Sequence, residues 1–232
     1  MKKLSLTTVG GACAVLMVWC FVVGIVFMAS SGVETLIPET GQDALGWIAD
    51  VDDSGGAFFA GAWLTIVGGL LAAVAFVGFY DALRDAGPVL ILAPIIGAIG
   101  LTLVTISHLI PIGMAYELVP AYTDADAATR SSLAGTTDTL AIVSLVLNYT
   151  GNWLGWGVAV PLFAVAILKT SFLPRWIGWT GIVVAVFAGW LGLLGPASSA
   201  IEGISTIGFL AFFVFMASMG VVLLRGRRGA VA

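Results

Sequence analysis

Six long apolar runs dominate this sequence and decide what the chain can fold into. They occupy about residues 7–31, 57–80, 88–116, 138–168, 176–195 and 203–224. Each run is long enough to cross the hydrocarbon core of a bilayer, which takes roughly 20 helical residues. The runs are continuous and lack the alternation of β-barrel strands. The pattern predicts an all-α fold, in which residues 1–232 form a single polytopic membrane domain with a bundle of six transmembrane helices.

Charged residues are too scarce to cover a water-facing surface. Only 9% of the 232 residues are charged and 60% are hydrophobic, whereas about a quarter of an ordinary soluble chain is charged. The formal net charge of −4 supplies no basic surface that would attract phosphates. We therefore expect the lipid bilayer to be the main partner and expect no nucleic-acid binding.

Lys and Arg are distributed unevenly between the two sides of the predicted bundle. If both termini are cytoplasmic, eight of the nine basic residues lie inside and only Arg130 lies outside. The inside set is Lys2, Lys3, Arg84, Lys169, Arg175, Arg225, Arg227 and Arg228. Since cytoplasmic loops of membrane proteins carry an excess of Lys and Arg, this count predicts cytoplasmic N and C termini.

The third and fourth runs are longer than a bilayer core requires, so their outer ends are expected to project past the headgroups as a helical hairpin. The outer connections, 32–56 and 117–137, are each long enough to hold a short surface helix. In the first connection Thr40 is a candidate N-cap. A helix lying on the outer membrane surface is predicted after it from the helical spacing of Ala44, Leu45, Ile48 and Ala49.

Cofactor sites are not expected. The first run is too long for the apolar region of a secretory signal, about 7–15 residues, and is predicted to be a retained helix. Its two cysteines, Cys13 and Cys20, lie two helical turns apart and are too distant to form a disulfide with each other. With one His and two Cys in the whole chain, no zinc or haem cage can be assembled.

Glycines at close-packing spacing predict that helix backbones approach one another. Spacing of this kind lets helices pack closely within one chain or against a partner membrane subunit. The relevant sets are Gly151 with Gly155, and Gly189 with Gly192 and Gly195.

Polar residues gather at one depth near the outer ends of the third and fourth runs. His108 is twenty residues outward from Pro88, and Asn148 is twenty-one residues outward from Lys169, so both lie roughly 30 Å along their helices. Asn152 lies one turn deeper on the face of Asn148. Four more candidates are expected at or just above this level: Tyr116, Glu117, Asp138 and Glu202.

Two prolines add carbonyl acceptors to this region. A proline inside a helix removes the hydrogen bond to the carbonyl four residues earlier. Pro111 frees the carbonyl of Ser107, and Pro161 frees that of Gly157. These carbonyls and the polar side chains would line a shallow, outward-facing cavity for a ligand or ion. The alternative is structural, because polar side chains also fasten helices to each other or reach headgroup water.

Part of the chain resembles a known family. The features that carry the resemblance are Ser107-His108 at the end of a helix, Glu117-Leu118 followed by Ala121-Tyr122, a loop with Arg130, and Leu173-Pro174-Arg175-Trp176-Ile177-Gly178-Trp179. On these residues, about 99–196 is similar to an uncharacterised prokaryotic membrane family catalogued as domain of unknown function 4386. The resemblance implies a six-helix bundle in a prokaryotic plasma or inner membrane, and it implies no activity.

Three classes of function remain open. The first is a non-enzymatic protein that binds a small or lipidic ligand in the outer cavity, or an accessory subunit that contacts a membrane complex through glycine-rich faces. The second is a transporter of a small molecule or ion. An intramembrane enzyme is disfavoured, because the chain has no Gly-x-Ser-x-Gly, no His-Glu-x-x-His and no pair of carboxylates within a span.

Overall fold

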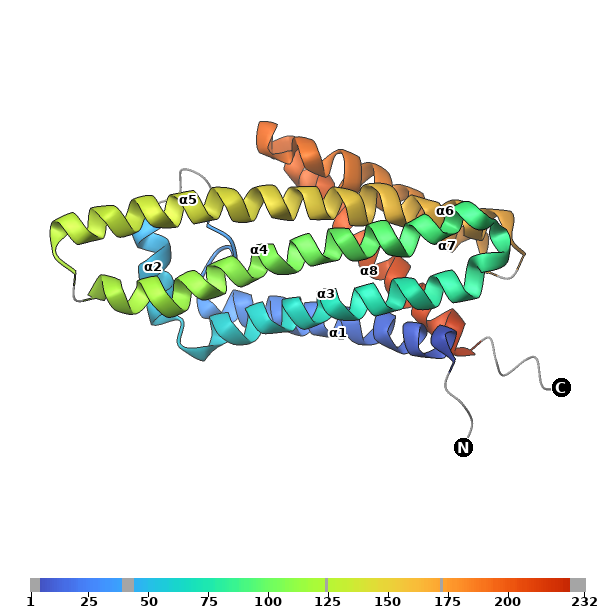
Figure 1. The fold of residues 1–232 in the computed structure, drawn as a ribbon, viewed down its shortest axis with the longest axis horizontal. Coiled ribbons are helices and arrows are strands. Elements are labelled where there is room, and N and C mark those ends of the chain that lie inside the picture. Colours follow the sequence, from blue (N-terminus) through green and yellow to red (C-terminus); the bar gives the residue numbers. More distant parts are fainter. Residues whose placement is uncertain (1–4, 39–43, 124, 172, 226–232) are drawn as a thin grey trace. The chain divides into compact units, whose positions relative to one another are not determined.

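The computed structural model describes residues 5–38, 44–123, 125–171 and 173–225, and these residues form helices with no strand (Figure 1). Six helices are long and apolar enough to cross a membrane: Leu6–Ser31, Gly56–Ala86, Pro88–Tyr122, Ala127–Lys169, Arg175–Gly195 and Gly203–Arg225. The predicted all-α class and the six apolar spans are therefore confirmed. The length and apolar composition of these six helices are those of a multi-pass membrane protein.

The spans contain regular and irregular segments. The α-helices are α1 (Leu6–Ser31), α2 (Ala44–Asp53), α3 (Gly56–Leu83), α4 (Leu92–Thr123), α5 (Ala127–Asn152), α6 (Val160–Lys169), α7 (Arg175–Val184) and α8 (Ser199–Arg225). Two wider, π-helical segments, η3 (Trp153–Ala159) and η4 (Ala185–Trp190), follow α5 and α7. Short 3₁₀ turns form η1 (Arg84–Ala86), η2 (Pro88–Ile91) and η5 (Gly192–Ala197).

The chain forms two compact units, each assembled from separated stretches. The first unit comprises Met1–Trp19, Gly69–Thr102 and Tyr149–Ala232, and the second comprises Cys20–Gly68 and Leu103–Asn148. Helices α1, α3, α4 and α5 contribute residues to both units.

Aromatic side chains fill the core of the first unit. The ring of Phe79 lies 5.8 Å from the ring of Phe163 and 6.2 Å from that of Phe215, in both cases edge to face. Phe76 lies 5.4 Å from Phe163. All four rings are completely buried, and edge-to-face pairs of this kind add to the stabilisation that burial provides.

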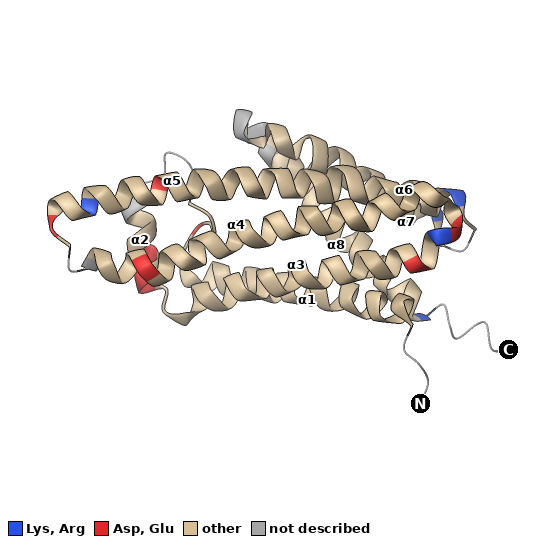
Figure 2. Cartoon of the chain, in the orientation of Figure 1, with Lys and Arg blue, Asp and Glu red and all other residues tan. Residues whose placement is uncertain are grey.

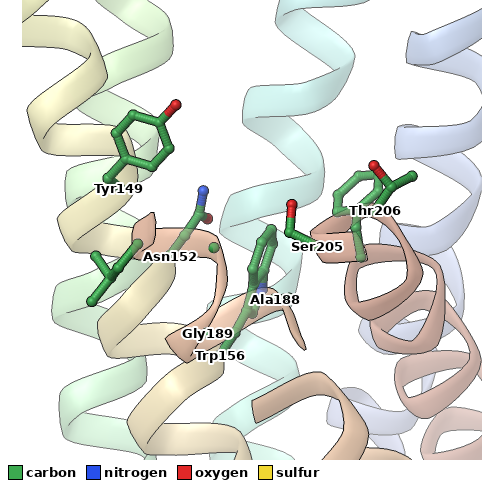
Figure 3. A pocket seen from close by; sticks show the side chains of 10 residues that line it. Tyr149, Asn152, Trp156, Ala188, Gly189, Ser205 and Thr206 are labelled. Carbon is green, nitrogen blue, oxygen red and sulfur yellow. The ribbon is translucent and has the colours of Figure 1, made fainter. Parts of the chain in front are cut away.

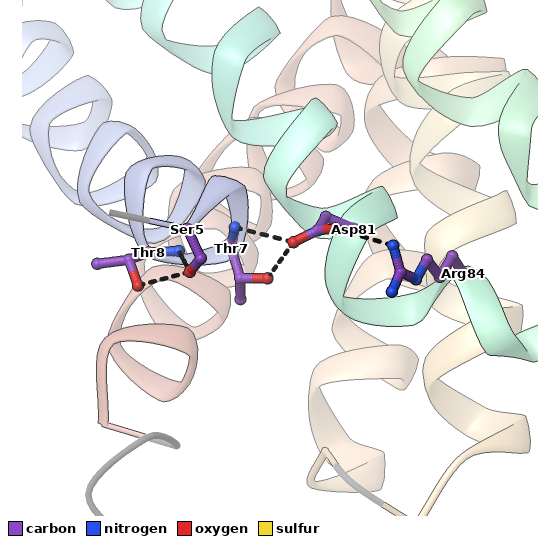
Figure 4. A network of polar contacts seen from close by, with 5 residues as sticks. All are labelled: Ser5, Thr7, Thr8, Asp81 and Arg84. Carbon is purple, nitrogen blue, oxygen red and sulfur yellow. Dashed lines mark hydrogen bonds and ion pairs between the residues drawn. The ribbon is translucent and has the colours of Figure 1, made fainter. Parts of the chain in front are cut away.

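The start of α1 is tied to the end of α3 by a carboxylate. One oxygen of Asp81 accepts hydrogen bonds from the backbone N–H of Thr7, at 3.2 Å, and from its hydroxyl, at 2.6 Å (Figure 4). Its other oxygen lies 3.5 Å from the guanidinium of Arg84. Because the first N–H groups of a helix have no partner within the helix, Asp81 supplies α1 with a cap from another segment.

Glycines bring helices into backbone contact in the first unit. A methyl group built on Gly78 of α3 would lie 2.5 Å from the Cα of Gly10 on α1. One built on Gly100 of α4 would lie 2.6 Å from the carbonyl oxygen of Gly151 and 2.8 Å from the nitrogen of Gly155. The close approach predicted for Gly151 and Gly155 is therefore confirmed, and their neighbour is a helix of the same chain.

In the second unit α4 and α5 form the expected helical hairpin. Residues 117–137 do not form a separate surface helix, because α4 continues to Thr123 and α5 begins at Ala127. The carboxylate of Asp126 accepts a hydrogen bond from the backbone N–H of Thr129 at 2.8 Å, which caps α5. This bond, which favours the charged form, lowers the pKa of Asp126.

A helix is present where the first outer connection predicted one, although its buried face differs from the prediction. On α2 Ile48 is buried as expected, but Ala49 is exposed. Thr40 and the side chains of the other two predicted residues lie outside the described part of the structure. Trp47 and Val51 complete the buried face, which packs in a cluster with Phe58 of α3 and with residues of α4. The apolar face of α2 is therefore covered by protein.

Most charged residues lie towards helix ends and in connections, whereas Asp138 lies within α5 (Figure 2). In α3, for example, the first charged residue after Gly56 is Asp81. Because a charge inside a bilayer is costly, a charge-free stretch of this length fits a membrane span.

Candidate functional site

A cluster of polar side chains joins α4 to α5 in the second unit. The amide nitrogen Nδ2 of Asn148 lies 3.2 Å from the hydroxyl of Ser107 and 3.2 Å from Nε2 of His108. The Ser107 hydroxyl in turn donates to the carbonyl of Val104 at 2.7 Å. Two predicted site residues, His108 and Asn148, are thus in direct contact, in an arrangement typical of helix fastening.

The carbonyl that Pro111 frees has found a donor within this cluster. The hydroxyl of Ser144 donates to the carbonyl oxygen of Ser107, and both serines are completely buried. Pro111 has no N–H to offer this carbonyl, and a side chain of α5 supplies a donor. Ser144 had not been singled out from the sequence, because its partner lies 37 residues away along the chain.

A cavity of about 250 Å³ lies in the first unit, and we call it the Asn152 cavity (Figure 3). Its lining comes from α5, η3, η4, η5 and α8 and consists of Tyr149, Asn152, Trp156, Ala188, Gly189, Gly192, Leu193, Ser205, Thr206 and Phe209. Among the predicted site residues Asn152 belongs to this lining, whereas His108 and Asn148 do not.

Polar and aromatic groups both line the Asn152 cavity. Asn152 brings an amide and α8 brings the hydroxyls of Ser205 and Thr206 (Figure 3). Tyr149, Trp156 and Phe209 supply aromatic walls, and Trp156 and Phe209 are in contact at 5.7 Å. A mainly apolar wall with a few polar groups is the usual composition of a small-molecule site.

Two of the segments that wall the cavity, η3 and η4, depart from α-helical geometry, whereas α5 and α8 contribute regular α-helix. Trp156 lies in η3, and Ala188 and Gly189 lie in η4. The backbone N–H of Leu191 bonds to the carbonyl of Val186, five residues earlier, which is the spacing of a π-helical turn. Such turns are rare and are found frequently at functional sites.

The two π-helical segments, η3 and η4, are joined by a hydrogen bond to the carbonyl of Gly157, the second carbonyl whose backbone donor a proline removes. The indole N–H of Trp190 donates to the carbonyl oxygen of Gly157 at 3.1 Å, where Pro161 provides no backbone donor. The two walls also touch through backbone atoms, because a methyl group built on Gly189 would lie 2.3 Å from the Cα of Gly157. The glycine at 189 is therefore required by close packing beside the cavity.

The remaining predicted candidates lie elsewhere. Tyr116 is exposed and stacks on Phe59 with ring centres 4.7 Å apart. Glu117 is exposed at the edge of an open apolar groove on α4 and α5, and Asp138 is exposed on α5. Glu202 belongs to α8, and its side chain lies outside the described part of the structure.

Several lining residues of the cavity were missed by sequence reasoning. Tyr149 and Trp156 share a helical face with Asn152, at spacings of three and four residues, and this signal could have found them. Ser205 and Thr206 come from α8, and no pattern in the sequence connects α8 with α5.

No group of three or more potential metal ligands occurs among the residues that the structure describes. No family model, curated protein or solved structure matches the chain.

Proposed function

We propose that this chain is a multi-pass membrane protein that binds a small, uncharged ligand in the Asn152 cavity without transforming it. The observation that carries the proposal is the cavity itself, which combines an amide, the hydroxyls of Ser205 and Thr206 and three aromatic side chains beside two π-helical segments. Hydrogen bonds would orient the ligand, and the aromatic rings would provide most of the contact area.

The lining favours a neutral ligand. None of the described residues that line the cavity carries a charge. A charged ligand placed there would lose part of its hydration without gaining an opposite charge, which is unfavourable. The volume of about 250 Å³ lies at the lower end of the range for small-molecule pockets and favours a compact ligand.

A binding role is favoured over an enzymatic one by the placement of the titratable groups. A serine or threonine hydroxyl needs an adjacent base to act as a nucleophile. The chain has a single histidine, His108, which contacts Asn148 in the second unit. An accessory role through Gly151 and Gly155 is less favoured, because these residues already pack against Gly100.

Native mass spectrometry of the protein purified in a mild detergent tests the proposal. We expect a small-molecule adduct on the wild-type protein, retained by Thr150→Val, an exposed position of α5 outside the cavity lining. Asn152→Leu should reduce adduct occupancy about tenfold, the effect of removing one hydrogen-bonding group from the lining. Thr206→Val is a second test, because it removes a hydroxyl from the cavity lining while keeping nearly the same side-chain volume and leaving α5 unchanged.

Two results would contradict a ligand-binding role. One is a protein that carries no adduct in any preparation, and the other is equal adduct retention by Asn152→Leu and the wild type. Circular dichroism of each variant establishes that the helices have formed, so that loss of the adduct is not caused by unfolding.

We further propose that both termini face the cytoplasm of a prokaryotic cell. Support comes from the eight-to-one distribution of Lys and Arg for that orientation and from the resemblance described for residues 99–196. A reporter enzyme active only outside the cytoplasm should be active when inserted near Arg130 and inactive when fused after Arg225. The reverse pattern would overturn this orientation.

A further inference from the structure

A second cavity lies at the opposite end of α6 from η3, where the chain turns from α3 into α4. Its volume is about 370 Å³ and we call it the Lys169 groove. The lining consists of Ala86, Gly87, Pro88, Val89, Leu90, Leu162, Val165, Ala166 and Lys169. All of these belong to the first unit.

The groove is opened by the shape of the α3–α4 turn. Two short 3₁₀ segments, η1 and η2, meet at Gly87, whose φ of 141° is a conformation that other residues rarely adopt. The turn leaves apolar side chains of α6 accessible, and Val89 of η2 is itself 62% exposed. Eight of the nine lining residues are uncharged and non-polar, so the groove suits a hydrocarbon chain.

One positive charge stands at the edge of this apolar lining. Lys169 is the last residue of α6 and is exposed. Within the described residues it has no carboxylate at ion-pair distance, whereas Arg84, on the turn between α3 and α4, is paired with Asp81. A cation beside an apolar groove complements a molecule that has an anionic head and a hydrocarbon tail.

We propose that the Lys169 groove binds an anionic phospholipid, with the phosphate on the ammonium group of Lys169 and one acyl chain along α6 and η2. The apolar lining selects a lipid over a soluble anion, and the charge selects an anionic lipid over a zwitterionic one. The position of Lys169 among the predicted cytoplasmic residues assigns this lipid to the inner leaflet. This site is separate from the Asn152 cavity, and neither proposal depends on the other.

The test is a titration of the full-length protein in detergent with dioleoyl-phosphatidylglycerol and, separately, dioleoyl-phosphatidylcholine, with bound lipids counted by native mass spectrometry. The wild type should prefer phosphatidylglycerol. Lys169→Gln should weaken phosphatidylglycerol binding about fivefold, the effect expected for one basic residue, and leave phosphatidylcholine binding unchanged. Arg175→Gln, an exposed basic residue outside the groove lining, should retain the wild-type preference.

A second variant tests the acyl-chain part of the proposal. Val165 lines the groove and is 42% exposed, so Val165→Trp fills the groove from its open side without burying the larger side chain in the core. It should reduce binding of phosphatidylglycerol while Lys169 is present. The proposal is overturned if Lys169→Gln and Arg175→Gln have equal effects, if both lipids bind equally to the wild type, or if glycerol phosphate competes as well as the whole lipid.

Discussion

The hydrogen bond from Ser144 to the carbonyl of Ser107 gives a quantitative prediction about stability. Pro111 cannot donate to this carbonyl, so Ser144→Ala removes a donor from a buried acceptor. Loss of such a donor costs about 1–3 kcal/mol in water-soluble proteins, and hydrogen bonds between helices in membranes average about 0.6 kcal/mol with a maximum near 1.7. We therefore expect Ser144→Ala to lower the free energy of unfolding by about 1 kcal/mol.

The same reasoning predicts how this cost depends on Pro111. In Pro111→Ala the new backbone N–H at position 111 can bond to the carbonyl of Ser107 within α4. Adding Ser144→Ala to that variant should then cost only a few tenths of a kcal/mol, so the two substitutions are coupled by close to 1 kcal/mol. Unfolding by sodium dodecyl sulfate in mixed micelles, followed by circular dichroism, measures all four proteins of the cycle.

A matched control lies on the same helix. The hydroxyl of Thr139 donates to the carbonyl of Gly135 within α5 and is exposed, so Thr139→Val should change stability by less than about 0.5 kcal/mol in both backgrounds. The reasoning is refuted if Ser144→Ala costs the same with and without Pro111, because the carbonyl would then not depend on the serine for its donor.

Two further predictions concern helix packing and capping. Gly78→Ala should destabilise the protein by about 1–3 kcal/mol, because the added methyl group would meet the backbone of Gly10. Gly113→Ala is the control and should not destabilise the protein, because no neighbouring atom lies within 4 Å of the added methyl group. Thermal unfolding in detergent measures both variants. The hydrogen bond from Thr129 lowers the pKa of Asp126. The contribution of this bond to stability is therefore fully present above the ordinary carboxyl pKa of 3.8, and it is lost as the pH falls through the lowered pKa of Asp126. The difference in stability between Asp126→Asn and the wild type should therefore become smaller as the pH is lowered. A difference that becomes larger on acidification would contradict this prediction.

Features that depend on local chain geometry could be predicted from the sequence. The six spans follow from the length and continuity of the apolar runs. The freed acceptors at Ser107 and Gly157 follow from the covalent structure of proline. Both carbonyls accept a hydrogen bond in the structure, one from a serine and one from Trp190.

Features that depend on long-range packing could not be predicted in the same way. The donors of these two bonds lie 37 and 33 residues from their acceptors, and helical periodicity says nothing about contacts at that separation. The helical spacing predicts a buried face of α2 that includes Ile48 and Ala49, but in the structure Trp47 and Val51 join Ile48 on it and Ala49 is exposed. Its partners come from α3 and α4, so the face depends on how these helices meet.

Asn148 and Asn152 show why residue type and spacing leave the function open. Both are asparagines in the C-terminal part of α5, one turn apart, and nothing in the sequence distinguishes their roles. Asn148 contacts two side chains of α4, which use its amide as a fastener. Asn152 is the last residue of α5 before the helix widens into η3, and its side chain lines a cavity with aromatic walls. The change in helix geometry beside Asn152, rather than its polarity, therefore distinguishes the candidate ligand site from a packing contact.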